Sequence, residues 1–97
     1  MHDPYIKEKM AEAYKEALKC YKRRKNYSKC ADYCEKLHHY FFSIREYDLE
    51  EKYFYDMCGY MERIIPDLEY DKDWIAVAGL YERMKNPEKA ITYYKKR

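Results

Sequence analysis

A chain of 97 residues with a net charge of +2 holds a single hydrophobic core, and its charge balance gives no global attraction to nucleic acid or membranes. No apolar stretch is long enough to span a bilayer, and the N-terminus lacks the apolar core of a signal peptide. Four cysteines without an export signal favour free thiols in a reducing compartment, so we expect a cytoplasmic protein.

The amino-acid composition favours helix along the whole chain. Only two glycines and three prolines interrupt segments rich in Ala, Glu, Lys, Leu, Met and Arg. Aliphatic residues are scarce, but fourteen tyrosines supply apolar ring surface. We therefore predict an all-α protein whose core is aromatic, with Ala and Cys as small fillers.

The first two predicted helices lie on either side of a basic run. Asp3 is a suitable N-cap for a helix that begins at Pro4, and apolar residues then recur at helical spacing until residues 22–25. Asn26 is a suitable cap for the second helix, whose apolar stripe extends to Ile44.

A third helix is predicted over residues 48–65, with apolar residues on two sides. Asp48 and Glu51 have the spacing of a capping box, and Pro66 is expected to end the helix. Residues 66–71 would then form the longest connection of the chain.

The last part of the chain predicts a second pair of helices. The fourth helix is expected to run from about Asp73 to Lys85. Asn86-Pro87 combines a cap with a proline at the first helical position, so a fifth helix should begin there. Five helices with short links are expected to pack antiparallel to their neighbours.

Two segments of the sequence, beginning at Tyr14 and at Trp74, align without gaps at an offset of sixty residues. Aromatic, small and turn positions coincide in the two segments. The matching pairs include Tyr14 with Trp74, Ala17 with Val77, Tyr21 with Tyr81, Asn26 with Asn86, Cys30 with Ala90 and Tyr33 with Tyr93. This agreement predicts a duplicated unit of two helices joined by a turn.

The pattern Trp74-x-x-Val77-Ala78-x-x-Tyr81, followed by Ala90-x-x-x-Tyr94, resembles the tetratricopeptide repeat. The resemblance implies a short solenoid of stacked antiparallel hairpins. One domain, residues 1–97, would contain repeat-like units at 11–44 and 71–97 around the divergent helix 48–65.

In the tetratricopeptide family the first helices of successive hairpins line a concave groove that holds a peptide. The resemblance therefore implies a protein-interaction module that binds a peptide or helix of a partner protein in such a groove. The residues carried over to groove positions are Lys15, Lys19, Lys22 and Arg23 in the first unit and Ile75, Gly79, Glu82 and Arg83 in the last.

Two other functions compete with peptide binding. The uncapped terminal helices could associate with a second copy, which would make the chain a self-assembling scaffold. The basic cluster at 19–29 could instead bind RNA or a phosphoprotein, although it also suits the end of a helix as a purely structural feature.

Catalysis and metal binding have little support in the sequence. Cys30, Cys34 and His38 follow one another at successive helical turns, as zinc ligands could, but small buried core residues explain the cysteines more simply. His39 has no nucleophile or carboxylate in a recognisable catalytic arrangement. We therefore predict no enzymatic activity, no metal and no cofactor.

Overall fold

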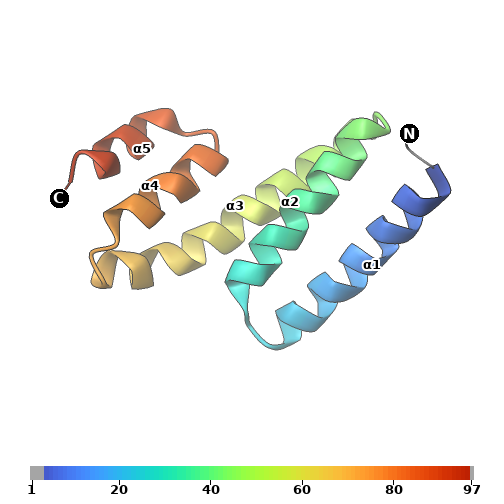
Figure 1. The fold of residues 1–97 in the computed structure, drawn as a ribbon, viewed down its shortest axis with the longest axis horizontal. Helices are drawn as coiled ribbons and strands as arrows, with labels where there is room; N and C mark the ends of the chain where they lie inside the picture. Colours follow the sequence, from blue (N-terminus) through green and yellow to red (C-terminus); the bar gives the residue numbers. More distant parts are fainter. Residues whose placement is uncertain (1–3, 97) are drawn as a thin grey trace.

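The computed structural model describes residues 4–96, and in this range the chain forms five α helices and no strand. The predicted all-α class is confirmed. Figure 1 shows that the first and last helices lie at opposite ends of a molecule measuring 46 × 28 × 24 Å. The helices are α1 (Pro4–Arg23), α2 (Tyr27–Ser43), α3 (Tyr47–Tyr70), α4 (Trp74–Arg83) and α5 (Pro87–Tyr94).

The helices follow one another in an open series and do not close around one centre (Figure 1). Within residues 4–96, the backbones of two helices approach closely only where those helices are consecutive in the sequence. The helices differ in length, from 24 residues in α3 to 8 in α5. This variation departs from the uniform units of a regular repeat array.

Side-chain contacts between alternate helices show that the series has two layers. The ammonium group of Lys22 in α1 interacts with the hydroxyl of Tyr60 in α3, on one side of α2. Arg83 at the end of α4 reaches Asp32 in α2, across α3. Helices α1 and α3 therefore belong to one layer, and α2 and α4 belong to the other.

The centre of the core lies between α2 and α3. Leu37, Met57 and Met61 have at most 1% of their surface exposed, and Cys30 and Cys34 are fully buried beside them. The prediction of an aromatic core was wrong in part, because eight tyrosines pack half-buried around a centre made mainly of aliphatic, Met and Cys side chains. This position keeps their hydroxyls within reach of water or of a polar partner.

All four connections between helices are turns of the same type. In each, a basic residue has a positive φ and the next residue donates its backbone N–H to the carbonyl five positions earlier, which satisfies the end of the preceding helix. The basic residues are Lys25, Arg45, Lys72 and Lys85, with φ values of 56°, 62°, 57° and 59°. Glycine usually occupies this position because left-handed backbone strains other residues.

Three helix starts have side-chain caps, and two of these caps, Asn26 and Asn86, were predicted from the sequence. Asn26, Asp73 and Asn86 each accept a hydrogen bond from the backbone N–H three residues later. The predicted capping box at Asp48 is wrong, because α3 begins at Tyr47 after Glu46. Asp3 lies outside the described residues.

The prediction that Pro66 ends the third helix is also wrong. Helix α3 continues through this proline to Tyr70, so residues 66–71 are not a connecting loop. Proline removes one backbone donor, but its exposed ring does not displace neighbouring helices. The helix ends at the left-handed Lys72, whose turn is closed by the cap residue Asp73.

Candidate functional site

The two aligned hairpins contain the same cluster of three aromatic rings, which we call the aromatic triad. In α1–α2 it comprises Tyr14, Tyr21 and Tyr33, with ring centroids 5.9 and 5.7 Å from that of Tyr33. In α4–α5 it comprises Trp74, Tyr81 and Tyr93, with centroids 6.1 and 5.5 Å from that of Tyr93. The second pair in each triad is stacked, at 15° and 18°.

A lysine at the equivalent position lies over each triad. The Nζ atom of Lys36 is 5.6 Å from the ring centroid of Tyr14, and that of Lys96 is 5.0 Å from the centroid of Trp74. The sixty-residue alignment thus corresponds to equal geometry in the hairpin interior.

The surroundings of the two triads differ. Helix α3 covers the α4–α5 hairpin, where Val77 is fully buried and the Tyr93 hydroxyl donates a hydrogen bond of 2.6 Å to Glu69. No helix in residues 4–96 covers the equivalent face of α1, where Ala17 is half-exposed.

A hollow of about 510 Å³ lies between α3 and the α4–α5 hairpin, and we call it the α3–α5 crevice. We call the lining from α3 and from α5 its walls, and the lining by Tyr81 and Met84, at the end of α4, its floor. Its lining comprises Phe54, Tyr55, Cys58, Glu62, Ile65, Pro66, Tyr81, Met84, Asn86 and Lys89.

The crevice combines an apolar floor with charges at its edges. Tyr81 and Met84 of α4 form the floor, while Glu62 of α3 and Lys89 of α5 are exposed on opposite walls. The Nζ atom of Lys89 lies 5.3 Å from the centroid of the Tyr81 ring, so its aliphatic stem extends over the floor. Such a lining suits an apolar side chain with charged neighbours.

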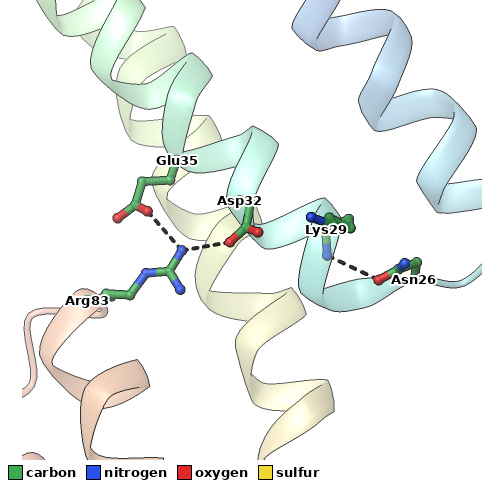
Figure 2. A network of polar contacts seen from close by, with 5 residues as sticks. All are labelled: Asn26, Lys29, Asp32, Glu35 and Arg83. Carbon is green, nitrogen blue, oxygen red and sulfur yellow. Dashed lines mark hydrogen bonds and ion pairs between the residues drawn. The ribbon is translucent and has the colours of Figure 1, made fainter. Parts of the chain in front are cut away.

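Two polar contacts fix the α4–α5 hairpin against the rest of the molecule. Besides the Tyr93–Glu69 hydrogen bond, the Arg83 guanidinium forms ion pairs of 3.2 Å with Asp32 and 2.8 Å with Glu35. Figure 2 shows Arg83 extending from the end of α4 toward both carboxylates on α2. These contacts supplement the small backbone interface between α3 and α4.

The Glu69 carboxylate also controls the ionisation of Tyr93. The hydrogen bond to Glu69 raises the pKa of the Tyr93 hydroxyl to about 12, so the donor is protonated at neutral pH.

Cys58 is the only thiol in the lining of the crevice, and burial raises the pKa of this thiol. A protonated thiol is a poor nucleophile, so the crevice holds no activated cysteine. Within residues 4–96, no group of three or more His, Cys, Asp or Glu side chains is arranged to hold a metal ion.

The first set of groove residues expected from the sequence lies on α1. The Nζ atom of Lys15 is 5.4 Å from the Phe41 ring centroid, and Lys22 faces Tyr60. Both lysines therefore lie on the side of α1 that looks toward α2 and α3, far from the α3–α5 crevice.

The other two α1 residues are engaged within their own helix. Lys19 forms an exposed ion pair of 3.7 Å with Glu16, and the Arg23 guanidinium lies 3.4 Å from the Cys20 Sγ atom. Basic side chains with such local partners suit the structural interpretation of the cluster at 19–29.

The second expected set, on α4, divides between two faces. Ile75 is 72% exposed, and Glu82 accepts a hydrogen bond from the Tyr94 hydroxyl on the face away from α3. Gly79 lies between them, and open space surrounds the position of an added Cβ. Arg83 points to α2 instead. The structure does not bring the α1 and α4 sets into one groove, because α1 and α4 belong to different layers.

Sequence reasoning did not find the crevice because six of its ten lining residues come from α3, the helix that fits neither repeat. One signal was available. Phe54, Cys58 and Ile65 form a second apolar stripe on that helix, which shows that it contacts neighbours on two sides.

Comparison with protein-family models, curated proteins and solved structures gives no match to this chain. Within residues 4–96, none of the helices combines the length and apolar character that a membrane span needs.

Proposed function

We propose that the chain is a tetratricopeptide-like interaction module that binds a short segment of a partner protein in the α3–α5 crevice. The observation that carries this proposal is a hollow of about 510 Å³ with an apolar floor and opposite charges on its two walls. Helix-lined grooves of this kind bind peptides through a few apolar anchors.

The lining indicates the chemistry of the bound segment. An aliphatic or aromatic side chain would occupy the floor at Tyr81 and Met84. A basic residue on one side of this anchor would face Glu62, and an acidic residue on the other side would face Lys89. The two rim charges are exposed, so they contribute orientation more than affinity.

Peptide display against the purified protein tests the proposal. Selected peptides should share one apolar anchor flanked by a basic and an acidic residue. Met84→Arg places a charge on the floor and should weaken their binding at least roughly tenfold, since a buried unpaired charge costs several kcal/mol. Ile75→Arg is the matched control, because it adds the same side chain to the opposite face of α4.

A second variant separates binding from folding. Lys89 is exposed, so Lys89→Glu should preserve the melting temperature and shift the selected consensus toward a basic residue at the acidic position. Peptides that bind Met84→Arg as well as wild type would refute the crevice. Loss of binding in Ile75→Arg alone would place the site on the outer face of α4.

A further inference from the structure

Helix α1 has an apolar stripe that nothing in residues 4–96 covers. Its buried side, with Ala11 and Leu18, packs on α2. The second stripe comprises Ile6, Met10, Ala13, Ala17 and Cys20. Ile6 and Met10 are 55% and 48% exposed, Ala13 and Cys20 are exposed and Ala17 is half-exposed.

The spacing of this stripe is that of a helix-to-helix seam. Successive members are four, three, four and three residues apart, which is the a/d pattern of a coiled coil. A helix face that contacts only solvent does not require apolar residues at this spacing over four turns. The stripe therefore fits a second helix lying along α1.

The internal repeat shows how such a helix would lie. On α4, the equivalents of Ala17 and Cys20 are Val77 and Leu80, and both are buried beneath α3. Helices α3 and α4 are consecutive and joined by a tight turn, so they run antiparallel. A helix antiparallel to α1 would thus take the position that α3 has on α4.

The charges beside the stripe identify α1 of a second copy as that helix. Lys9 and Glu16 flank the same side of the stripe, seven residues apart. Within the chain they form exposed pairs with Glu12 and Lys19, and Lys9 also lies 5.5 Å from the Tyr5 ring centroid. In an antiparallel pair of α1 helices, Lys9 faces Glu16 of the partner subunit at one register only. The neighbouring register, seven residues away, would bring Glu16 against Glu16 of the partner subunit.

The register that pairs these charges also matches large side chains with small ones. It places Ile6 against Ala17 of the partner subunit and Met10 against Ala13 of the partner subunit. The two-fold axis repeats each of these two contacts, so no two large side chains meet. Charge excludes one neighbouring register, and volume excludes the other, which would bring Ile6 against Met10 of the partner subunit.

We propose that two copies of this chain form an antiparallel dimer through the α1 stripe, with Lys9–Glu16 ion pairs on one flank. Helix α1 is at the opposite end of the molecule from α5, so both α3–α5 crevices stay open in the dimer (Figure 1). The dimer does not depend on the proposed peptide binding. The paired stretch, about 16 residues or roughly 24 Å long, is a small interface, so we expect association in the micromolar range.

Sedimentation equilibrium over a concentration series tests the dimer. Wild type should dissociate reversibly, and Ala13→Glu should be monomeric at every concentration. Ser28→Glu is the matched control, since it adds the same charge at an exposed position on α2. Glu16→Lys should raise the dissociation constant roughly fivefold, and the double variant Lys9→Glu with Glu16→Lys should restore it.

Disulfide trapping tests direction and register. In a Cys20→Ser background, Ile6→Cys and Ala17→Cys chains should form a disulfide only when mixed, with oxidised glutathione as oxidant. Disulfides within either chain type alone would show a parallel dimer and overturn the proposal. A wild type that stays monomeric at millimolar concentration, or a dimer that persists in Ala13→Glu, would also overturn it.

Discussion

The hairpins α1–α2 and α4–α5 have the same interior and different neighbours. Their aromatic triads agree to within a few tenths of an ångström in centroid separation, and their turns agree to within a few degrees in φ. One hairpin lies beneath α3, while no helix in residues 4–96 covers the equivalent face of the other. The repeated residues therefore specify a hairpin, and residues outside the repeat decide what covers it.

This difference separates the two proposed sites. The covered hairpin forms a crevice with α3, and Tyr81 of its triad lines that crevice. The open hairpin has a complete apolar stripe that a second copy can cover. Substitutions at equivalent positions of the two hairpins should therefore change the free energy of unfolding unequally where the residue contacts α3. They should change it equally where the residue contacts only its own hairpin.

The largest inequality is expected at Val77 and its equivalent Ala17. Val77→Asp places an unpaired charge beneath α3 and should lower the free energy of unfolding by about 3–5 kcal/mol. Ala17→Asp adds the same carboxylate on a half-exposed face, so its cost should stay below about 1 kcal/mol, the difference in helix propensity. Urea unfolding below the dimer dissociation constant measures both. Equal losses would show that the α1 face is covered in the monomer.

Arg83 and its equivalent Arg23 give the next contrast. Arg83→Met removes both ion pairs to α2, and we expect a loss of about 1 kcal/mol because the guanidinium is one-third exposed. Arg23 contacts only Cys20 in its own helix, so Arg23→Met should change stability by less than about 0.5 kcal/mol. Thermal melts at low and high salt provide the measurement. The Arg83 effect should shrink in high salt, and a salt-independent loss would instead indicate packing of the side chain.

A smaller contrast concerns Tyr93 and its equivalent Tyr33. The Tyr93 hydroxyl donates to Glu69, while no side chain in residues 4–96 accepts a hydrogen bond from Tyr33. Tyr93→Phe should cost about 0.5–1 kcal/mol, and Tyr33→Phe should be nearly neutral. Because the pKa of Tyr93 is raised to about 12, its contribution is complete below pH 10 and is lost as the pH rises from about 10 to 12.

Unfolding measured along this pH range gives the test. Wild type should lose stability more steeply than Tyr93→Phe. Cys34 also lowers stability as the pH rises, because burial raises the pKa of its thiol to about 12. The variant Cys34→Ala measures how much of the alkaline slope comes from this thiol. Identical alkaline slopes for wild type and Tyr93→Phe would contradict the role of Glu69.

Those residues whose neighbours are close in sequence could be predicted well. Asn26 and Asn86 cap their helices as expected, since a cap is a contact over three residues. The triads also follow from the alignment, because each lies within one hairpin. Pro66 was misleading, since a local rule ended α3 where packing on both neighbours lets it continue.

The candidate site was harder to predict because its lining comes from three helices. Lys15 and Ile75 occupy equivalent positions in the sequence alignment, yet α3 places their helices in different layers. A stack of equal hairpins would have aligned them. The single long helix α3 stands between the two hairpins, so α1 and α4 lie in different layers. No local pattern in the sequence predicts this placement.

The smallest effect should be equal in the two hairpins and lies in their turns. Lys25 and Lys85 have φ values of 56° and 59°, where a side chain is strained and glycine is not. Lys25→Gly and Lys85→Gly should each stabilise the protein by about 0.5–1 kcal/mol, less the entropy that glycine adds to the unfolded chain. Lys29→Gly is the control, because glycine inside α2 should destabilise by about 1 kcal/mol. Equal gains would confirm that the turn belongs to the repeated unit, whereas a gain at one site only would show that α3 strains the turn of the hairpin it covers.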